Sequence, residues 1–188
     1  GAMQILAMML FFPILRKFLG TIQVFYTSFV MAILGYAVLL ILMIVNMSNL
    51  YLLFVPAFFI FSANGMLSVL STVFLANTVD YGEWKNHRRD ESVIFSMQTF
   101  VVKAASGVAV FLTGIGLDLI GLVGNTDETG PAAAQSAGTL LGLRLMMTIL
   151  PMLVLAGVLV LFQRKFVLTD ERAAEISAQL HGEAAKHE

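Results

Sequence analysis

The sequence predicts an all-α membrane protein, and three observations lead to this prediction. Of the 188 residues, 59% are hydrophobic and 12% are charged, whereas a soluble domain carries about 25% charged residues. The apolar residues gather in runs, most of which exceed the roughly 20 residues that a helix needs to cross the hydrocarbon core. The basic residues lie almost entirely in every second connection between these runs.

The apolar runs divide residues 1–166 into one partial and four complete membrane-spanning helices. The partial helix, residues 3–15, is too short to cross a bilayer, so we interpret it as the end of a longer helix. The complete helices are expected at about residues 25–45, 50–79, 93–122 and 139–162. Together they predict a transmembrane bundle.

The basic residues favour a cytoplasmic C-terminus, because short cytoplasmic connections retain Lys and Arg. The opposite connections, 46–49 and 123–138, contain neither residue. We therefore expect a multi-pass protein of the cell membrane. The nine basic residues on the predicted cytoplasmic side are Arg16, Lys17, Lys85, Arg88, Arg89, Arg164, Lys165, Arg172 and Lys186.

Lys103 lies alone in an apolar stretch that carries no other charge until Asp118. An intramembrane charge costs about 2.5–3.5 kcal/mol on insertion scales, so such residues face a bundle interior or a water-filled path. Thr99 and Ser96 fall on the same helical face as Lys103. This face suits a cavity that admits water or a hydroxyl-rich solute. The alternative is close packing, since small residues also let membrane helices approach each other. The other small or polar residues on this face are Ser92, Ser106, Gly107, Gly114, Asp118 and Gly121.

Asp118 and Arg144 form a second feature, because both lie several residues inside the predicted outer ends of consecutive spans. Asp118 lies about 22 Å along its helix from Lys103 at 1.5 Å per residue, too far to be its partner. We interpret Asp118 and Arg144 as a structural pair across a helical hairpin. An outer gate is the alternative.

Residues 77–91 mix acids and bases at the predicted cytoplasmic boundary. A solvated connection that follows the positive-inside rule would explain their composition. However, Asp80 and Glu83 lie at the end of a span, where carboxylates can meet arginines of neighbouring helices, and Arg89 follows them closely in the sequence. We interpret these three residues as a cytoplasmic gate whose ion pairs break and re-form.

The same region resembles the glycoside-pentoside-hexuronide:cation symporters, a family that includes melibiose permease. The resemblance rests on the spacing between the DYGE string and the lysine of QTFVVK, and it extends over nearly the whole chain. One departure is Asn77, where the family often has aspartate. The residues that carry the resemblance are Asp80, Tyr81, Gly82, Glu83, Lys85, Arg89, Glu91, Ser92, Ser96, Gln98, Thr99 and Lys103.

The resemblance implies a major facilitator superfamily fold, in which two six-helix halves enclose a site near the bilayer midplane. This chain would be the C-terminal part of that fold. The function implied is import of a sugar or glycoside with a cation, H⁺ or Na⁺, by alternating access. Lys103 and Thr99 would then face the substrate and the coupling machinery, together with Ser96. Asp80, Glu83 and Arg89 would stabilise the outward-open state.

The resemblance also defines the expected partners. These are a sugar or glycoside, the lipid bilayer and an N-terminal half that this chain does not contain. No cofactor or metal site is expected, because the coupling cation would be bound mainly by the N-terminal half. Nucleic acid is not an expected partner, because the net charge is -1 and a nucleic-acid binder displays a basic patch.

Two other functions are alternatives to transport. A membrane hydrolase would use Lys103 to activate Thr99 or Ser106, but the sequence has no oxyanion motif and no metal-ligand pair, so we do not expect an enzyme. A structural or assembly subunit without transport of its own is the other alternative.

The tail, residues 167–188, is predicted to be a cytoplasmic amphipathic helix. Thr169 can cap this helix, and Asp170 and Glu171 in its first turn favour the positive end of the helix dipole. Ile176 and Leu180 give it one apolar edge.

Overall fold

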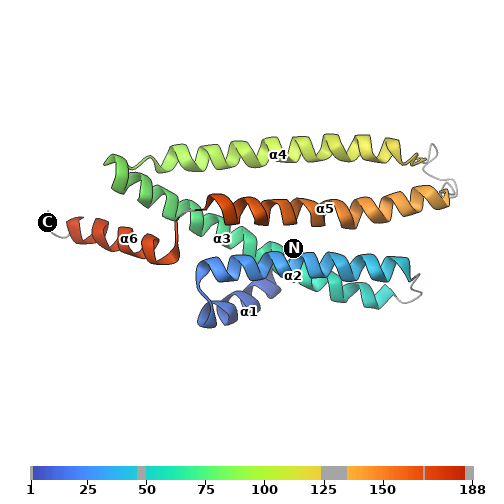
Figure 1. Ribbon diagram of the computed structural model, residues 1–188, viewed down its shortest axis with the longest axis horizontal. Coiled ribbons are helices and arrows are strands. Elements are labelled where there is room, and N and C mark those ends of the chain that lie inside the picture. The colour runs from blue at the N-terminus through green and yellow to red at the C-terminus, as the bar shows by residue number, and fades with distance from the viewer. Residues whose placement is uncertain (1, 46–49, 124–134, 167, 185–188) are drawn as a thin grey trace.

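The computed structural model describes residues 2–45, 50–123, 135–166 and 168–184, and the described chain is helical throughout. Four of its helices, α2 to α5, are long and apolar enough to cross a membrane, which confirms the number of long apolar helices expected from the sequence. The elements are α1 (Ala2–Phe18), α2 (Thr21–Ile44), the short 3₁₀ helix η1 (Leu50–Leu53), α3 (Phe54–Asn86), α4 (Glu91–Leu119), α5 (Ala137–Lys165) and α6 (Asp170–Ala184) (Figure 1).

The helices extend beyond the apolar runs that predicted them. Helix α3 continues to Asn86, past the expected end near residue 79, and α2 begins at Thr21 rather than near residue 25. The reason is that an apolar run marks only the stretch suited to hydrocarbon, whereas a helix continues for as long as it satisfies its backbone hydrogen bonds. His87 ends α3 in the left-handed conformation, with φ 52°, and its N–H donates to the carbonyl of Glu83 at 2.8 Å.

The bundle has a packed side and an open side. Helix α2 packs along α3 and α5, and α1 and α6 pack against α3. Helix α4 lies at one edge of the bundle (Figure 1) and buries none of its residues against the rest of the described chain. Two of its large apolar side chains, Phe100 and Phe111, are 66% and 68% exposed. The apolar surface of α4 is therefore left uncovered by the described chain.

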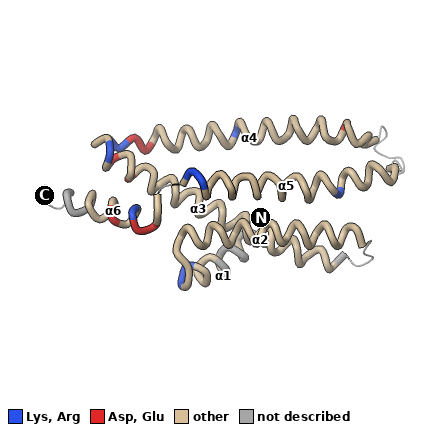
Figure 2. Tube along the Cα trace, in the orientation of Figure 1, with Lys and Arg blue, Asp and Glu red and all other residues tan. Residues whose placement is uncertain are grey.

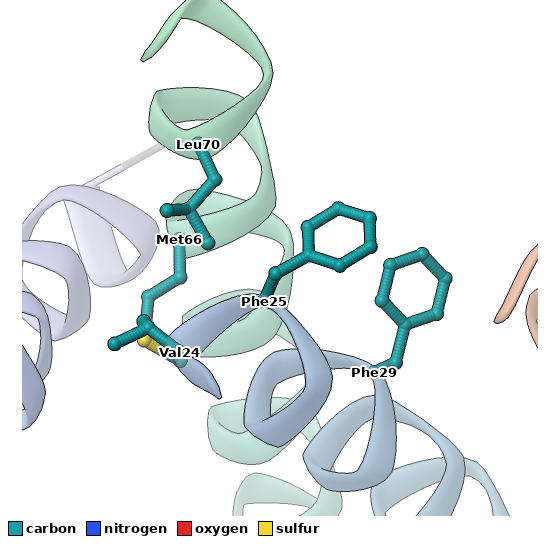
Figure 3. Close-up of a cluster of buried hydrophobic side chains, with 5 residues drawn as sticks. All are labelled: Val24, Phe25, Phe29, Met66 and Leu70. Atoms are coloured by element: carbon teal, nitrogen blue, oxygen red, sulfur yellow. The ribbon is translucent and has the colours of Figure 1, made fainter. Parts of the chain in front are cut away.

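The hydrophobic core lies between α2 and α3. Phe162 of α5 closes it, with a ring centroid 4.2 Å from that of Phe25. This core fixes the packed side of the bundle. Its buried side chains are Val24, Phe25, Phe29, Met66 and Leu70 (Figure 3).

Most of the charged side chains gather at one end of the bundle, which we call the basic end (Figure 2). The ends of α1, α3 and α5 and the starts of α4 and α6 all lie toward this end (Figure 1). Helix α6 packs against α3 at this end, where Ile176 is 4% exposed and the indole N–H of Trp84 donates to Oε1 of Gln179 at 2.9 Å. The described basic residues of this end are Arg16, Lys17, Lys85, Arg88, Arg89, Arg164, Lys165 and Arg172.

Candidate functional site

The junction between α3 and α4 brings together the three residues that the sequence analysis assigned to a gate. Nη1 of Arg89 lies 2.8 Å from Oε2 of Glu83 and 3.6 Å from Oδ1 of Asp80. Nε of the same guanidinium lies 3.2 Å from Oε2 of Glu91. We call these four residues the junction cluster. One arginine thus holds two carboxylates of α3 and one of α4.

The local backbone explains how this cluster forms. The left-handed residue His87 reverses the chain after α3, and Asp90 precedes the start of α4, where its carbonyl accepts from the N–H groups of Val93 and Ile94, each at 3.2 Å. Asp80 and Glu83 lie nearly one turn apart on α3, so both can face the returning chain. Arg89, in the middle of the turn, therefore reaches back to α3 and forward to α4.

The sequence analysis missed the role of Glu91 in this cluster. It named Glu91 only as part of the family-like string, although its position two residues after Arg89 was a signal for a local ion pair. The hydrogen bonds that Arg89 donates to Glu83 and Glu91 raise the pKa of Arg89 above its ordinary value. The guanidinium is half exposed, at 53%, so water competes for each of its contacts. These ion pairs can therefore break and re-form.

A cavity of about 280 Å³ lies beside the junction cluster. Its walls come from α3, the turn and the first turns of α4, so the cluster forms one side of a partly open space between the two helices. Its lining residues are Ala76, Val79, Asp80, Arg89, Glu91 and Phe95.

Lys103 lies near the middle of α4, about 18 Å along the axis from Glu91 at 1.5 Å per residue. Its side chain is exposed, and within the described chain it forms no ion pair. Thr99 and Ser96 occupy the preceding turns of the same face. The three predicted substrate residues thus share one face of one helix, and the structure brings no second helix of the described chain over them.

The hydroxyl groups on this face donate to their own helix. Oγ1 of Thr99 donates to the carbonyl of Phe95 at 3.0 Å, and Oγ of Ser96 donates to that of Ser92 at 2.6 Å. Each hydroxyl oxygen retains its capacity to accept. The face therefore presents one cation and a row of acceptors, which is a combination that can bind the hydroxyl groups of a solute.

The structure places Asp118 and Arg144 on adjacent helices, near the end of the bundle opposite the basic end. No ion pair joins the two side chains, both of which lie in the described ranges. The helices are nevertheless close there, because Oγ1 of Thr139, at the start of α5, donates to the carbonyl of Ile120 at 2.9 Å. The predicted pairing of Asp118 with Arg144 stays a prediction.

The sequence analysis also missed a contact of the tail. It interpreted Asp170 as a residue that stabilises the start of its own helix. In the structure, Oδ2 of Asp170 also accepts from the backbone N–H of Ile22 at 3.2 Å. No local pattern in the sequence could have indicated this contact, because it joins the first turns of two helices at opposite ends of the chain.

Comparison with known proteins agrees with this architecture. Residues 1–170 match the sequence profile of the family described as MFS/sugar transport protein. The chain is 29% identical over 191 residues to the uncharacterized symporter YjmB of Bacillus subtilis (strain 168), covering 96% of this chain and 40% of that protein. It is 30% identical over 174 residues to the uncharacterized symporter YnaJ of the same strain, covering 92% and 35%. It is 28% identical over 170 residues to the lactose permease of Lactobacillus delbrueckii subsp. bulgaricus, covering 90% and 26%.

Four long apolar helices and a profile match over residues 1–170 define a multi-pass membrane protein of a transport family. The chain belongs to the MFS/sugar transport protein family. This membership confirms the predicted resemblance to the glycoside-pentoside-hexuronide:cation symporters, and it confirms that the chain is not an enzyme. The chain spans 40% or less of the length of the three relatives named above.

Proposed function

We propose that this chain is the C-terminal part of a secondary active transporter that imports a sugar or glycoside together with H⁺ or Na⁺ by alternating access. The family match and the similarity to 40% of the length of a symporter support this assignment. The uncovered surface of α4 also supports it, because a partner half of the transporter would pack on this open side. The partner half would supply most of the groups that bind the coupling cation.

Lys103 is the residue on which this proposal depends. It carries a full charge near the middle of a helix of 29 residues, and in the described chain it forms no ion pair. The cost of such a charge in hydrocarbon favours a position on a wet path. Lys103 binds the solute or takes part in coupling its transport to the cation. Thr99 and Ser96 accept hydrogen bonds from solute hydroxyl groups.

The junction cluster supports a gate at the basic end. Its ion pairs are partly exposed and join two helices through a short turn, so they can break when α3 and α4 move apart. Asp80, Glu83 and Arg89 close this end in the outward-open state. The concentration of basic residues at this end supports a cytoplasmic position for it and for the C-terminus.

At the opposite end of the bundle, Asp118 and Arg144 form a structural pair across α4 and α5 in the complete transporter. Covering the open side of α4 removes water from this end, which strengthens the attraction between the two charges.

The proposal is tested by replacing Lys103 in the full-length protein with the neutral residue of similar length, Lys103→Met. We expect accumulation of sugar in whole cells or vesicles to be abolished, while the variant still inserts into the membrane. Lys85→Met is the matched control, because it removes a basic residue of α3 that lies at the basic end. Accumulation at the wild-type level by Lys103→Met would exclude the residue from transport.

Counterflow of labelled sugars through the complete protein separates transport from the structural alternative. Exchange of one sugar class with the unlabelled pool is the expected result, and its dependence on Na⁺ or on pH identifies the cation. A complete protein that binds and exchanges none of the galactosides, xylosides or glucuronides would instead support an assembly subunit.

A further inference from the structure

A cavity of about 330 Å³ lies at the basic end, where α3, the end of α5 and the start of α6 meet. Its volume is within the range of small-ligand pockets, about 300–1,000 Å³. It contains none of the residues assigned above to transport or to the gate. Its lining residues are Thr78, Tyr81, Lys165, Phe166, Leu168 and Arg172.

Two cations line this cavity without a counter-ion from the described residues. Lys165 ends α5 and Arg172 lies in the first turn of α6. Neither forms an ion pair with a carboxylate in the part of the chain that the structure describes. The nearby carboxylate of Asp170 accepts from the N–H of Ile22 and is not part of the lining. Both cationic groups are donors without acceptor capacity, so a ligand that binds them must supply acceptors.

The other walls add a donor and an apolar surface. The phenol of Tyr81 forms no hydrogen bond within the described chain, and Nζ of Lys85 lies 5.9 Å from the centroid of its ring, which adds positive charge beside the cavity. Phe166 and Leu168 form an apolar wall. A ligand with several acceptor oxygens on one side and an aliphatic group on the other would satisfy this arrangement.

We propose that this cavity binds the phosphate group of an anionic phosphate ester. Arginine binds phosphate through two parallel hydrogen bonds, and lysine adds a point charge. Basic pockets between membrane helices at the cytoplasmic side bind anionic headgroups. The phosphate can belong to a lipid headgroup such as that of phosphatidylglycerol or to a soluble ester such as glycerol 3-phosphate, and its chemistry is the same in both.

The test uses the full-length protein in neutral detergent and measures two quantities. Native mass spectrometry counts bound phosphatidylglycerol and phosphatidylcholine, and thermal unfolding is followed with each lipid or with glycerol 3-phosphate. In the wild type we expect phosphatidylglycerol or glycerol 3-phosphate to bind and to raise Tm, and phosphatidylcholine to do neither. Lys165→Gln combined with Arg172→Gln should weaken the binding about tenfold or more. Arg164→Gln is the matched control, because Arg164 precedes Lys165 on α5 and does not line the cavity.

The results identify the source of the phosphate or overturn the proposal. Selective binding of phosphatidylglycerol that requires Lys165 and Arg172 assigns a lipid site, and selective binding of glycerol 3-phosphate assigns a soluble ligand. If the double variant does not fold, Arg172→Gln alone is measured instead, and a smaller loss of binding is expected. Equal binding by the wild type and these variants, an equal loss in Arg164→Gln, or no binding by the wild type would overturn the proposal. None of these measurements depends on sugar transport, so this proposal and the proposed function fail independently.

Discussion

The carboxylate of Asp170 accepts a hydrogen bond from the backbone N–H of Ile22 at 3.2 Å, across 148 positions of sequence. Asp170 is in the first turn of α6, and Ile22 is in the first turn of α2. The first N–H groups of a helix have no partner within the helix, and the dipole of α2 favours a negative charge there. The contact therefore ties the tail helix to the start of a membrane-spanning helix.

We expect Asp170→Ala to remove this hydrogen bond between α6 and α2. The free energy of unfolding should fall by about 0.3–1 kcal/mol, the usual contribution of a charge at a helix terminus. The larger effect should be local, with faster hydrogen exchange of the backbone amides of α6. Glu171→Ala is the matched control, because it also removes a first-turn acid of α6 but has no hydrogen bond to α2 within the described chain. Equal exchange rates in the two variants would contradict the assigned role of Asp170.

Gly35 of α2 is buried where the helix packs closely on α3. A Cβ atom at this position would lie 2.9 Å from Cγ1 of Ile60 and 3.3 Å from its backbone nitrogen. Because the backbone cannot yield as a side chain can, we expect Gly35→Ala to destabilise the bundle by about 1–3 kcal/mol, as overpacking does. Thermal unfolding in detergent measures this change.

The control for Gly35→Ala is Gly157→Ala in α5, where an added Cβ would meet no atom within 4 Å. Alanine is a better helix former than glycine by up to about 1 kcal/mol. Gly157→Ala should therefore keep or raise Tm. A Gly35→Ala protein with the same Tm as the wild type would show that α2 and α3 are further apart than described.

Arg89→Gln should loosen the junction cluster without unfolding the protein. Exposed ion pairs contribute little to stability because water and salt screen them, so we expect little change in Tm. Hydrogen exchange across residues 87–95 should rise several-fold, because the turn loses its contacts with α3. Sugar accumulation by the full-length protein should fall. Arg88→Gln is the control, since the Arg88 side chain is 78% exposed and, among the described residues, its one ion pair is with Asp90, at 3.6 Å.

The ion pairs of the junction cluster should also persist at alkaline pH. The pKa of Arg89 is raised by its hydrogen bonds to Glu83 and Glu91. A cation whose pKa is raised on folding contributes stability below its unfolded pKa and loses it only as the pH rises through the folded value. Between pH 7 and pH 9 we therefore expect the ratio of exchange rates between Arg89→Gln and the wild type at residues 87–95 to be constant. A ratio that falls towards one at pH 9 would mean that another group controls the cluster.

Asp118 and Arg144 provide a test of the proposed structural pair in the complete transporter. We expect Asp118→Asn and Arg144→Gln each to lower Tm, and the double variant to lose less than the sum of the two. Residues in contact typically show coupling energies of about 0.5–3 kcal/mol. Additive losses within about 0.5 kcal/mol would show that the two charges act separately.

Much of the fold could be predicted because membrane helices depend on local chemistry. A run such as residues 25–45 must be helical in hydrocarbon, where each backbone polar group needs a partner within the segment. The ends of the helices were less predictable. Helix α3 continues to Asn86, because polar residues beyond the apolar run extend a helix wherever its hydrogen bonds and caps allow.

The candidate site could be predicted in part. Glu83 and Arg89 were assigned to one cluster because both lie at the predicted cytoplasmic boundary, and the structure places their charged atoms 2.8 Å apart. The partner of Lys103 could not be predicted, because spacing along one helix says nothing about which other helix faces it. The cavity between Lys165 and Arg172 was not foreseen for the same reason.

The sequence by itself determined the membrane class, the number of long helices and the face that carries Lys103, Thr99 and Ser96. These follow from hydropathy and from helical periodicity, which are properties of short segments. Only the tertiary structure decided that Asp170 contacts Ile22 and that Lys165 and Arg172 share a cavity. Such contacts depend on how separate helices pack, and the packing is decided by the summed fit of many side chains along α2, α3 and α5.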